Sequence, residues 1–260
     1  MENRADGRAD RRIAVLIDAD NVSSRYISLI LDEVSNQGTP TYKRIYGDWT
    51  SPRLASWKDV LLKHSVTPIQ QYSYTTGKNA TDSALIIDAM DILYSESVDG
   101  FCIVSSDSDF TRLASRLREA GMLVIGMGEK KTPAAFIAAC EKFKYLEVLA
   151  SVGGTEPAEA PVQKEKSGVV VKKPQPQSKE RQKLVKTIRT IVSEISDEDG
   201  WAFLGELGNV LNRRLPDFDT RNYGAMKLTQ LIESLDAFDI DSRKTTNSHA
   251  THKFIRNRQG

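Results

Sequence analysis

The sequence predicts an α/β protein, a parallel sheet between helices, followed by a small domain of helices and a hairpin. Strand-like and helix-like segments alternate through the first 150 residues, which favours right-handed crossovers and a parallel sheet. Residues 151–178 are rich in Pro, Gly, Glu and Lys with little apolar periodicity, as is typical of a flexible linker. We therefore expect domains at residues 10–150 and 179–258, joined by that linker.

The strands predicted in the first domain are short apolar or alternating segments. Residues 12–18, RIAVLID, form a continuous apolar run rich in β-branched side chains, which is typical of a buried strand. Residues 101–106, FCIVSS, form a second buried run, and residues 41–48, TYKRIYGD, alternate. The expected strands are residues 12–18, 41–48, 67–74, 101–106 and 122–128.

Helices are predicted between these strands, where apolar residues recur every three or four positions. Gly121 ends the helix expected at residues 109–121. Thr132 and Pro133 give an N-cap and a first helical position to the helix expected at residues 132–149. The expected helices are residues 23–35, 54–65, 81–95, 109–121 and 132–149.

The C-terminal domain is predicted to be mostly helical. Residues 178–195, 203–215 and 222–235 each show helical apolar spacing. Residues 237–257 have the pattern of two short strands around a polar turn. Three helices and a β-wing make a small winged-helix (α+β) domain.

Composition excludes several classes of protein. With 40% hydrophobic and 27% charged residues, the chain has an ordinary globular composition. It has no apolar run near the roughly 20 residues of a membrane span and no secretory signal, so no membrane association is expected. Its two cysteines lack metal-ligand spacing, which favours buried thiols in a reducing cytoplasm.

The net charge alone does not indicate that the protein binds nucleic acid. Residues 1–150 carry 18 Lys and Arg against 20 Asp and Glu, and residues 179–260 carry 14 against 12. Neither segment has the strong basic excess of a nucleic-acid footprint. Any binding of RNA or DNA has to be argued from sites.

Four acidic residues are predicted to converge at one edge of the sheet. Asp18 ends the first strand, Asp107 and Asp109 follow the strand at 101–106, and Asp82 begins a helix. Ligands of an open parallel sheet bind beyond the carboxyl ends of its strands. Four carboxylates there repel one another, unless one takes up a proton or a cation such as Mg²⁺ or Mn²⁺ binds them. A metal-bound water can attack a phosphodiester.

Each of these residues also has a simpler interpretation. An Asp at a strand end or helix start is often a turn residue or an N-cap. Asn21 either orients water or a phosphate oxygen, or caps the helix that follows, and Lys78 either steers a phosphate or lies in a loop. Asp88 and Asp91 lie well round the helix from Asp82, which favours a solvated face or a salt bridge. Asp88, within the apolar stretch LIIDAM, also suits a buried residue that supports the metal-site residues.

Three motifs resemble the NYN domain of the PIN-like nuclease superfamily, typified by LabA-like proteins. They are IDADN at 17–21, KNATD at 78–82 and SSDSDF at 105–110, within roughly residues 12–148. The resemblance implies a Rossmann-like PIN fold and a ribonuclease dependent on Mg²⁺ or Mn²⁺. It implies that the metal-site residues are Asp18, Asp82, Asp107 and Asp109, with Asn21 as a polar partner in catalysis. PIN-like domains often pair, so a homodimer is left open.

The C-terminal domain has a resemblance of its own. Residues 217–235, DFDTRNYGAMKLTQLIESL, resemble the LOTUS domain, also called OST-HTH, over roughly residues 179–257. That family is linked to RNA binding, single-stranded or structured, and to protein partners. Candidate RNA contacts, besides Lys78, are Arg221, Tyr223, Lys227, Arg243 and Lys244. The alternatives are core packing for the tyrosine and a solvated surface for the basic residues.

Two other functions compete with a ribonuclease as interpretations of the sequence. Residues 18–22, DADNV, fit the start of haloacid-dehalogenase phosphatases, but Lys78 precedes the hydroxyl-bearing strand end Ser105–Ser106, the reverse of the order that fold needs. A non-catalytic RNA-binding or regulatory adaptor stays open. For the ribonuclease, we expect Asp18, Asp82 and Asp107 to hold the metal directly or through water. Asp109 would position or deprotonate the attacking water, and the resemblance implies 5′-phosphate and 3′-hydroxyl products.

Overall fold

The computed structural model describes residues 11–72, 80–152, 178–244 and 251–258. The predicted linker at 151–178 and the candidate Lys78 therefore lie largely or wholly outside the described residues. The chain divides into two compact units, Met1–Glu156 and Pro157–Gly260, and each is described by itself. Among the described helices, none is long and apolar enough to cross a membrane.

The first unit is built on a six-stranded sheet in which every neighbouring pair is parallel. The strand order is β3-β2-β1-β4-β5-β6, so the chain runs outward from β1 to β3 and then returns to the other side of β1. This places the reversal of strand order between β1 and β4, where open α/β sheets bind ligands. The strands are β1 (Arg12–Asp18), β2 (Thr39–Gly47), β3 (Thr67–Gln70), β4 (Gly100–Val104), β5 (Leu123–Gly128) and β6 (Lys142–Tyr145).

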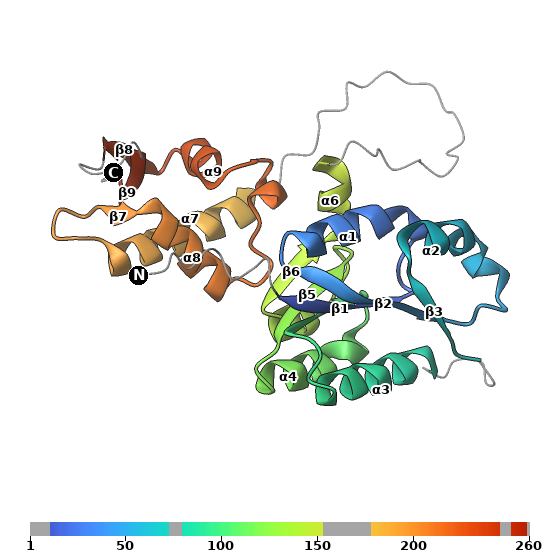
Figure 1. Ribbon diagram of the computed structural model, residues 1–260. Coiled ribbons are helices and arrows are strands. Elements are labelled where there is room, and N and C mark those ends of the chain that lie inside the picture. The colour runs from blue at the N-terminus through green and yellow to red at the C-terminus, as the bar shows by residue number, and fades with distance from the viewer. Residues whose placement is uncertain (1–10, 73–79, 153–177, 245–250, 259–260) are drawn as a thin grey trace, which may run out of the picture. The chain divides into compact units, whose positions relative to one another are not determined.

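Helices cover both faces of this sheet, with α1 and α2 on one face and α3 and α4 on the other (Figure 1). Successive side chains of β1 point to opposite faces, so Val15 joins the core beneath α1 while Leu16 joins the core beneath α3 and α4. The predicted α/β fold is confirmed. The helices are α1 (Ile27–Ser35), α2 (Lys58–His64), α3 (Ala80–Tyr94), α4 (Thr111–Glu119), α5 (Ala134–Ala139) and α6 (Leu146–Val152).

The single helix predicted at residues 132–149 is wrong. It is divided into α5, the edge strand β6 and α6, because Cys140 adopts an extended conformation and ends α5. Phe143 of β6 lies so close to β5 that a Cβ on Gly126 would stand 2.5 Å from its ring. The hydroxyl of Thr132 donates to the carbonyl of Glu129 (2.6 Å) and does not cap the helix. The strand predicted at 67–74 likewise ends early, at Gln70.

The second unit packs three helices against a three-stranded antiparallel sheet of order β7-β9-β8. The helix predicted at 222–235 is shorter than expected, because Gly224 takes a left-handed φ of 79° and ends a 3-10 turn before α9 begins. The sequence did not predict the two-residue strand β7. The elements are α7 (Ser178–Ile195), β7 (Ala202–Phe203), α8 (Leu204–Arg214), α9 (Leu228–Leu235), β8 (Phe238–Lys244) and β9 (Thr251–Asn257).

We expect Gly126→Ala to destabilise the first unit, because the added methyl group would overlap the buried side chains of Phe143 and Cys140. Overpacking of this kind costs about 1–3 kcal/mol of unfolding free energy. Urea unfolding measures it, with Glu119→Ala at the exposed end of α4 as a control that changes little. Equal stability of the two variants would contradict the packing of β6 against β5.

Candidate metal centre

Asp18 is held rigidly at the carboxyl end of β1. Its side chain is fully buried, and its Oδ2 accepts hydrogen bonds from Asn21 Nδ2 (2.7 Å) and Ser105 Oγ (2.8 Å). Its Oδ1 accepts from the backbone N–H of Asp20 (3.0 Å). Burial raises the pKa of Asp18, and these hydrogen bonds act in the opposite direction by favouring the carboxylate. The contacts fix the direction in which the carboxylate faces.

Asn21 and Ser105 are therefore parts of the same local arrangement. The predicted alternative for Asn21, a helix cap, is not what the structure shows, because its amide contacts Asp18 and the first turn begins after Ser23. Ser105 follows β4, which pairs with β1 so that Ile17 faces Val104. Its hydroxyl also accepts from the backbone N–H of Asp107 (3.1 Å), joining the two strand ends.

Asp107 and Asp109 lie in the turn that follows β4. The carboxylate of Asp107 accepts from the backbone N–H of Asp109 (2.9 Å) and so caps the short 3-10 turn Ser108–Phe110. The capping interpretation of Asp107 is thus correct. A carboxylate has two oxygens with about four acceptor positions, so capping leaves room for a second ligand. Asp107 is partly buried, and Asp109 is exposed.

The acidic triplet is formed by Asp82, Asp107 and Asp109, each of which offers one carboxylate oxygen within 4.8 Å of the others. Asp82 comes from the first turn of α3, and the other two come from the turn after β4. Partial burial raises the pKa of Asp82 to about 6, and the charges of Asp18, Asp107, Asp109 and Asp20 add to that effect. Asp18 is therefore close enough to affect the pKa of Asp82, although it lies outside the acidic triplet.

An ion pair joins α3 to the neighbouring strand β2. Asp88 forms a salt bridge with Arg44 and accepts a hydrogen bond from the hydroxyl of Tyr46, both on β2. Tyr46 is fully buried and faces Asp18 in the register of β1 with β2. Of the predicted interpretations of Asp88, the structure shows the salt bridge, formed by a partly buried carboxylate. The interaction holds the helix that carries Asp82 against the strand beside Asp18.

Sequence reasoning missed two contributors to this centre. Asp20 raises the pKa of Asp82 and accepts a 3.3 Å hydrogen bond from Thr81 Oγ1, which joins the start of α3 to the loop after β1. Ser105 orients Asp18. The motif DAD at 18–20 was a visible signal for Asp20, whereas Ser105 could be found only from the pairing of β1 with β4.

The donor chemistry of this edge fits a hard divalent cation. All the groups that approach one another are carboxylates, the ligands that Mg²⁺ and Mn²⁺ prefer. Burial and then mutual repulsion raise the pKa of Asp82, and a bound cation would relieve that repulsion.

The candidate RNA contacts of the C-terminal unit lie in different environments. Arg221 forms a bidentate pair with Asp219, through Nε to Oδ1 (2.9 Å) and Nη2 to Oδ2 (2.7 Å). Tyr223 packs against the core, as its alternative interpretation predicts. Lys227 is exposed at the start of α9.

The remaining two candidates are on β8. The exposed Arg243 lies over the ring of Phe254, with its Cζ 4.4 Å from the ring centroid. Lys244 is the last residue of that strand. Among the described side chains, Arg221, Tyr223, Lys227 and Arg243 therefore have different contacts.

Two family models match the chain, an NYN domain at residues 12–147 and an OST-HTH/LOTUS domain at residues 176–250. No curated protein matches. One similar solved structure is a protein of unknown function from Vibrio parahaemolyticus, with 18% identity, 55% of this chain and 94% of that chain covered, and a TM-score of 0.44. Another is an uncharacterized protein from Nitrosomonas europaea, with 28% identity, 40% and 93% covered, and a TM-score of 0.28.

Without metal, Asp82→Asn should raise the unfolding free energy at pH 7.5. The pKa of Asp82 is about 6 in the folded protein against an ordinary 3.8, so folding disfavours the ionised carboxylate. This penalty is absent below pH 4, grows between pH 4 and 6, and is complete above pH 6. After discounting for solvent screening, it is on the order of 1 kcal/mol.

Urea unfolding in EDTA at pH 4 and pH 7.5 measures this effect, with Asp91→Asn on the exposed side of α3 as the matched control. The gain should appear at pH 7.5 and vanish at pH 4. Equal stability of wild type and Asp82→Asn at pH 7.5 would contradict the raised pKa of Asp82.

Proposed function

Because the chain belongs to the NYN domain family, a PIN-like nuclease family, and also carries an OST-HTH/LOTUS domain, we propose that it is a metal-dependent ribonuclease. In this proposal the first unit hydrolyses RNA phosphodiester bonds and the C-terminal unit binds the RNA. The observation that carries it is the acidic triplet, which lies beyond the carboxyl ends of β1 and β4 with Asp18 beside it.

The metal would be Mg²⁺ or Mn²⁺, held by Asp18, Asp82, Asp107 and Asp109, and it would supply an acidified water and positive charge at the phosphate. Asn21 and Ser105 would keep the carboxylate of Asp18 facing the site. Asp109 is the most exposed of the triplet, so it is suited to position the attacking water and take its proton. In-line attack on phosphorus would leave a 5′-phosphate and a 3′-hydroxyl.

The proposal also includes a cytoplasmic location. Cys102 and Cys140 are both buried free thiols, and burial raises the pKa of each, to about 12 for Cys140. Thiols held in this unreactive form suit a reducing compartment.

The nuclease proposal predicts that Asp107→Asn and Asp18→Asn each reduce RNA cleavage on the order of 100-fold or more, because each removes a charge that would hold the metal. The assay is cleavage of single-stranded and duplex RNAs with Mn²⁺, Mg²⁺ or EDTA. Asp91→Asn is the matched control and should cleave at the wild-type rate. Normal cleavage by Asp107→Asn would show that the site is assigned wrongly. RNA binding without cleavage under any condition would favour the adaptor.

Ser105→Ala should lower the cleavage rate by about 10–100-fold, because Asp18 would lose a hydrogen bond that orients it. Ser108→Ala, at an exposed position in the following turn, is the control. The rate is measured over a range of Mn²⁺ concentrations. A positioning role predicts that Ser105→Ala needs more Mn²⁺ for half-maximal cleavage, and an unchanged requirement would rule that role out.

A further inference from the structure

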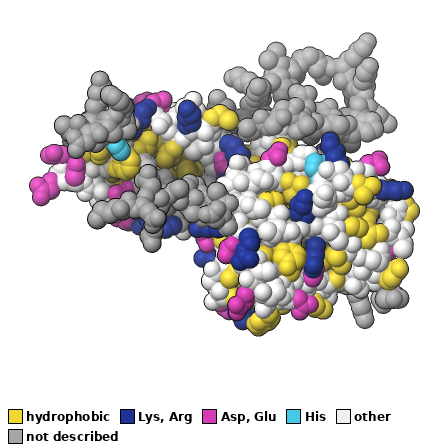
Figure 2. All heavy atoms as spheres, viewed as in Figure 1, with side chains coloured by type: hydrophobic (Ala, Val, Ile, Leu, Met, Phe, Trp, Pro, Cys, Tyr) yellow, Lys and Arg dark blue, Asp and Glu magenta, His cyan; other side chains and the backbone are white. Residues whose placement is uncertain are grey.

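The outer face of the β7-β9-β8 sheet carries aromatic and cationic side chains. Along β9, Ile255 points into the core, so its neighbours Phe254 and Arg256 point to the opposite face. Phe203 of β7 pairs with Phe254 and shares that face, while Ala202 is buried opposite Ile255. Hydrophobic side chains reach the surface of this unit in the space-filling view, with a histidine beside them (Figure 2).

These side chains form one connected surface, which we name the aromatic platform. The ring of Phe203 lies 5.3 Å from that of His252 and 5.9 Å from that of Phe254, measured between centroids. The guanidinium of Arg243 lies 4.4 Å from the centroid of Phe254 and 5.3 Å from that of Trp201, and Arg256 lies 4.6 Å from Trp201. The platform therefore consists of Trp201, Phe203, Arg243, His252, Phe254 and Arg256.

The platform is held in place before any partner binds. Phe203 is 39% exposed, yet its ring lies directly against Gly205, where an added Cβ would stand 2.6 Å from the ring edge. Arg243 Nε donates to Asp241 Oδ2 (2.9 Å), and Arg256 Nη2 reaches Asp239 Oδ2 (3.4 Å). Because these ion pairs are exposed, each contributes little, and a phosphate can replace the carboxylate at small cost.

We propose that the aromatic platform binds the bases of single-stranded RNA by stacking, with Arg243 and Arg256 meeting the phosphates. The proposal rests on RNA being the substrate proposed above, and it names the surface that holds it. Exposed aromatic rings combined with arginines are the means by which single strands are bound without reading their sequence. The rings and guanidinium groups of the platform favour bases and phosphates over a protein partner.

The OST-HTH/LOTUS match does not by itself lead to this surface. It covers residues 176–250, whereas β9, which carries His252, Phe254 and Arg256, follows at Thr251–Asn257. The platform also shares only Arg243 with the contacts predicted from the sequence. The face is thus a separate candidate from Arg221 and Lys227.

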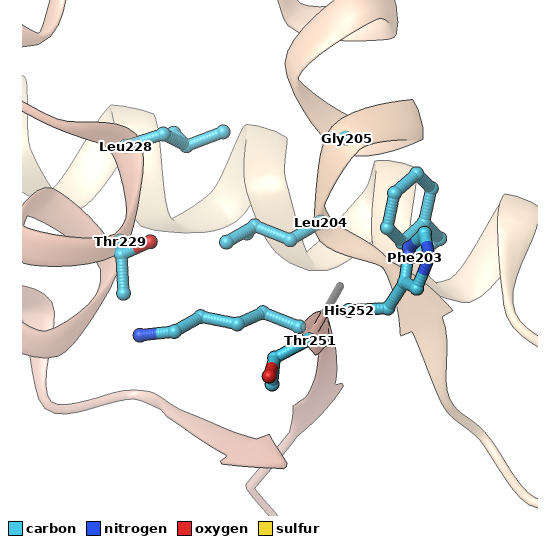
Figure 3. Close-up of a pocket in the computed structure, with 8 residues that line it drawn as sticks. Phe203, Leu204, Gly205, Leu228, Thr229, Thr251 and His252 are labelled. Carbon is cyan, nitrogen blue, oxygen red and sulfur yellow. The ribbon is translucent and has the colours of Figure 1, made fainter. Parts of the chain in front are cut away.

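A pocket adjoins the platform and extends it toward the starts of α8 and α9. Phe203 and His252 form one side, and Leu204 and Leu228 face it across the opening (Figure 3). Lys253 also lines this pocket. A base next to the one stacked on Phe203 and His252 would contact the apolar side chains of this pocket. Its phosphate would lie near the ammonium group of Lys253.

The test uses the full chain carrying Asp107→Asn, so that RNA is bound without being cut. A fluorescein-labelled 12-nucleotide single strand and a duplex of equal length are titrated by anisotropy. Adding Phe254→Leu, which keeps an apolar side chain but removes the ring, should weaken binding of the single strand roughly tenfold or more. Duplex binding should change less, because its bases are already stacked. Lys183→Ala and Lys186→Ala, at exposed positions of α7, are the controls and should change the affinity less than twofold.

A second measurement separates stacking from charge. Arg256→Gln should lower the salt dependence of binding by about one phosphate contact, while Phe254→Leu should leave that dependence unchanged. Circular dichroism and the midpoint of thermal unfolding check that each variant is folded.

The outcomes separate this inference from the proposed nuclease. If the Asp107→Asn chain binds the single strand and both platform variants bind it equally well, the inference is wrong. If wild type cleaves RNA with Mn²⁺ while the Asp107→Asn chain does not bind the single-stranded RNA, the inference fails and the nuclease proposal stands. The absence of both RNA binding and RNA cleavage would overturn both proposals.

Discussion

Repulsion between carboxylates at the reversal of strand order is the constraint on which the first unit depends. Parallel pairing of β1 with β4 places Asp18 beside Ser105 and leaves Asp107 in the following turn. The surrounding bonds keep these charges close: Asp18 is held by two side chains, and Asp88 anchors α3 to β2. These contacts hold the carboxylates close to one another although their charges repel.

The two units present different chemistry. The first gathers acids at one edge of a buried parallel sheet, where only a cation can approach at low cost. The second exposes rings and guanidinium groups on a small antiparallel sheet, whose other face is buried. In the proposed function, the units bind the same RNA in complementary ways, one through its phosphate at the bond to be cut and the other through its bases.

The sequence was sufficient to predict an element or a site residue wherever a single local pattern determines it. Continuous apolar runs located β1 and β4, and positions at strand ends and at a helix start predicted the convergence of Asp82, Asp107 and Asp109. The sequence was insufficient where a residue far along the chain determines the structure or the role of a segment. The short strand β6 depends on Gly126 of another strand, and Ser105 is recognisable only beside Asp18. Likewise, a two-residue strand has no detectable periodicity, so the exposed face that includes Phe203 was not foreseen.

The acids of the first unit are widely spaced along the chain, from Asp18 in β1 to Asp109 after β4, although they meet in space. A polypeptide still being synthesised therefore has no assembled centre when β1 leaves the ribosome, and acquires one only after α3 and β4 have emerged and docked. In the proposed function, the metal site is therefore incomplete during the early part of the protein's own synthesis.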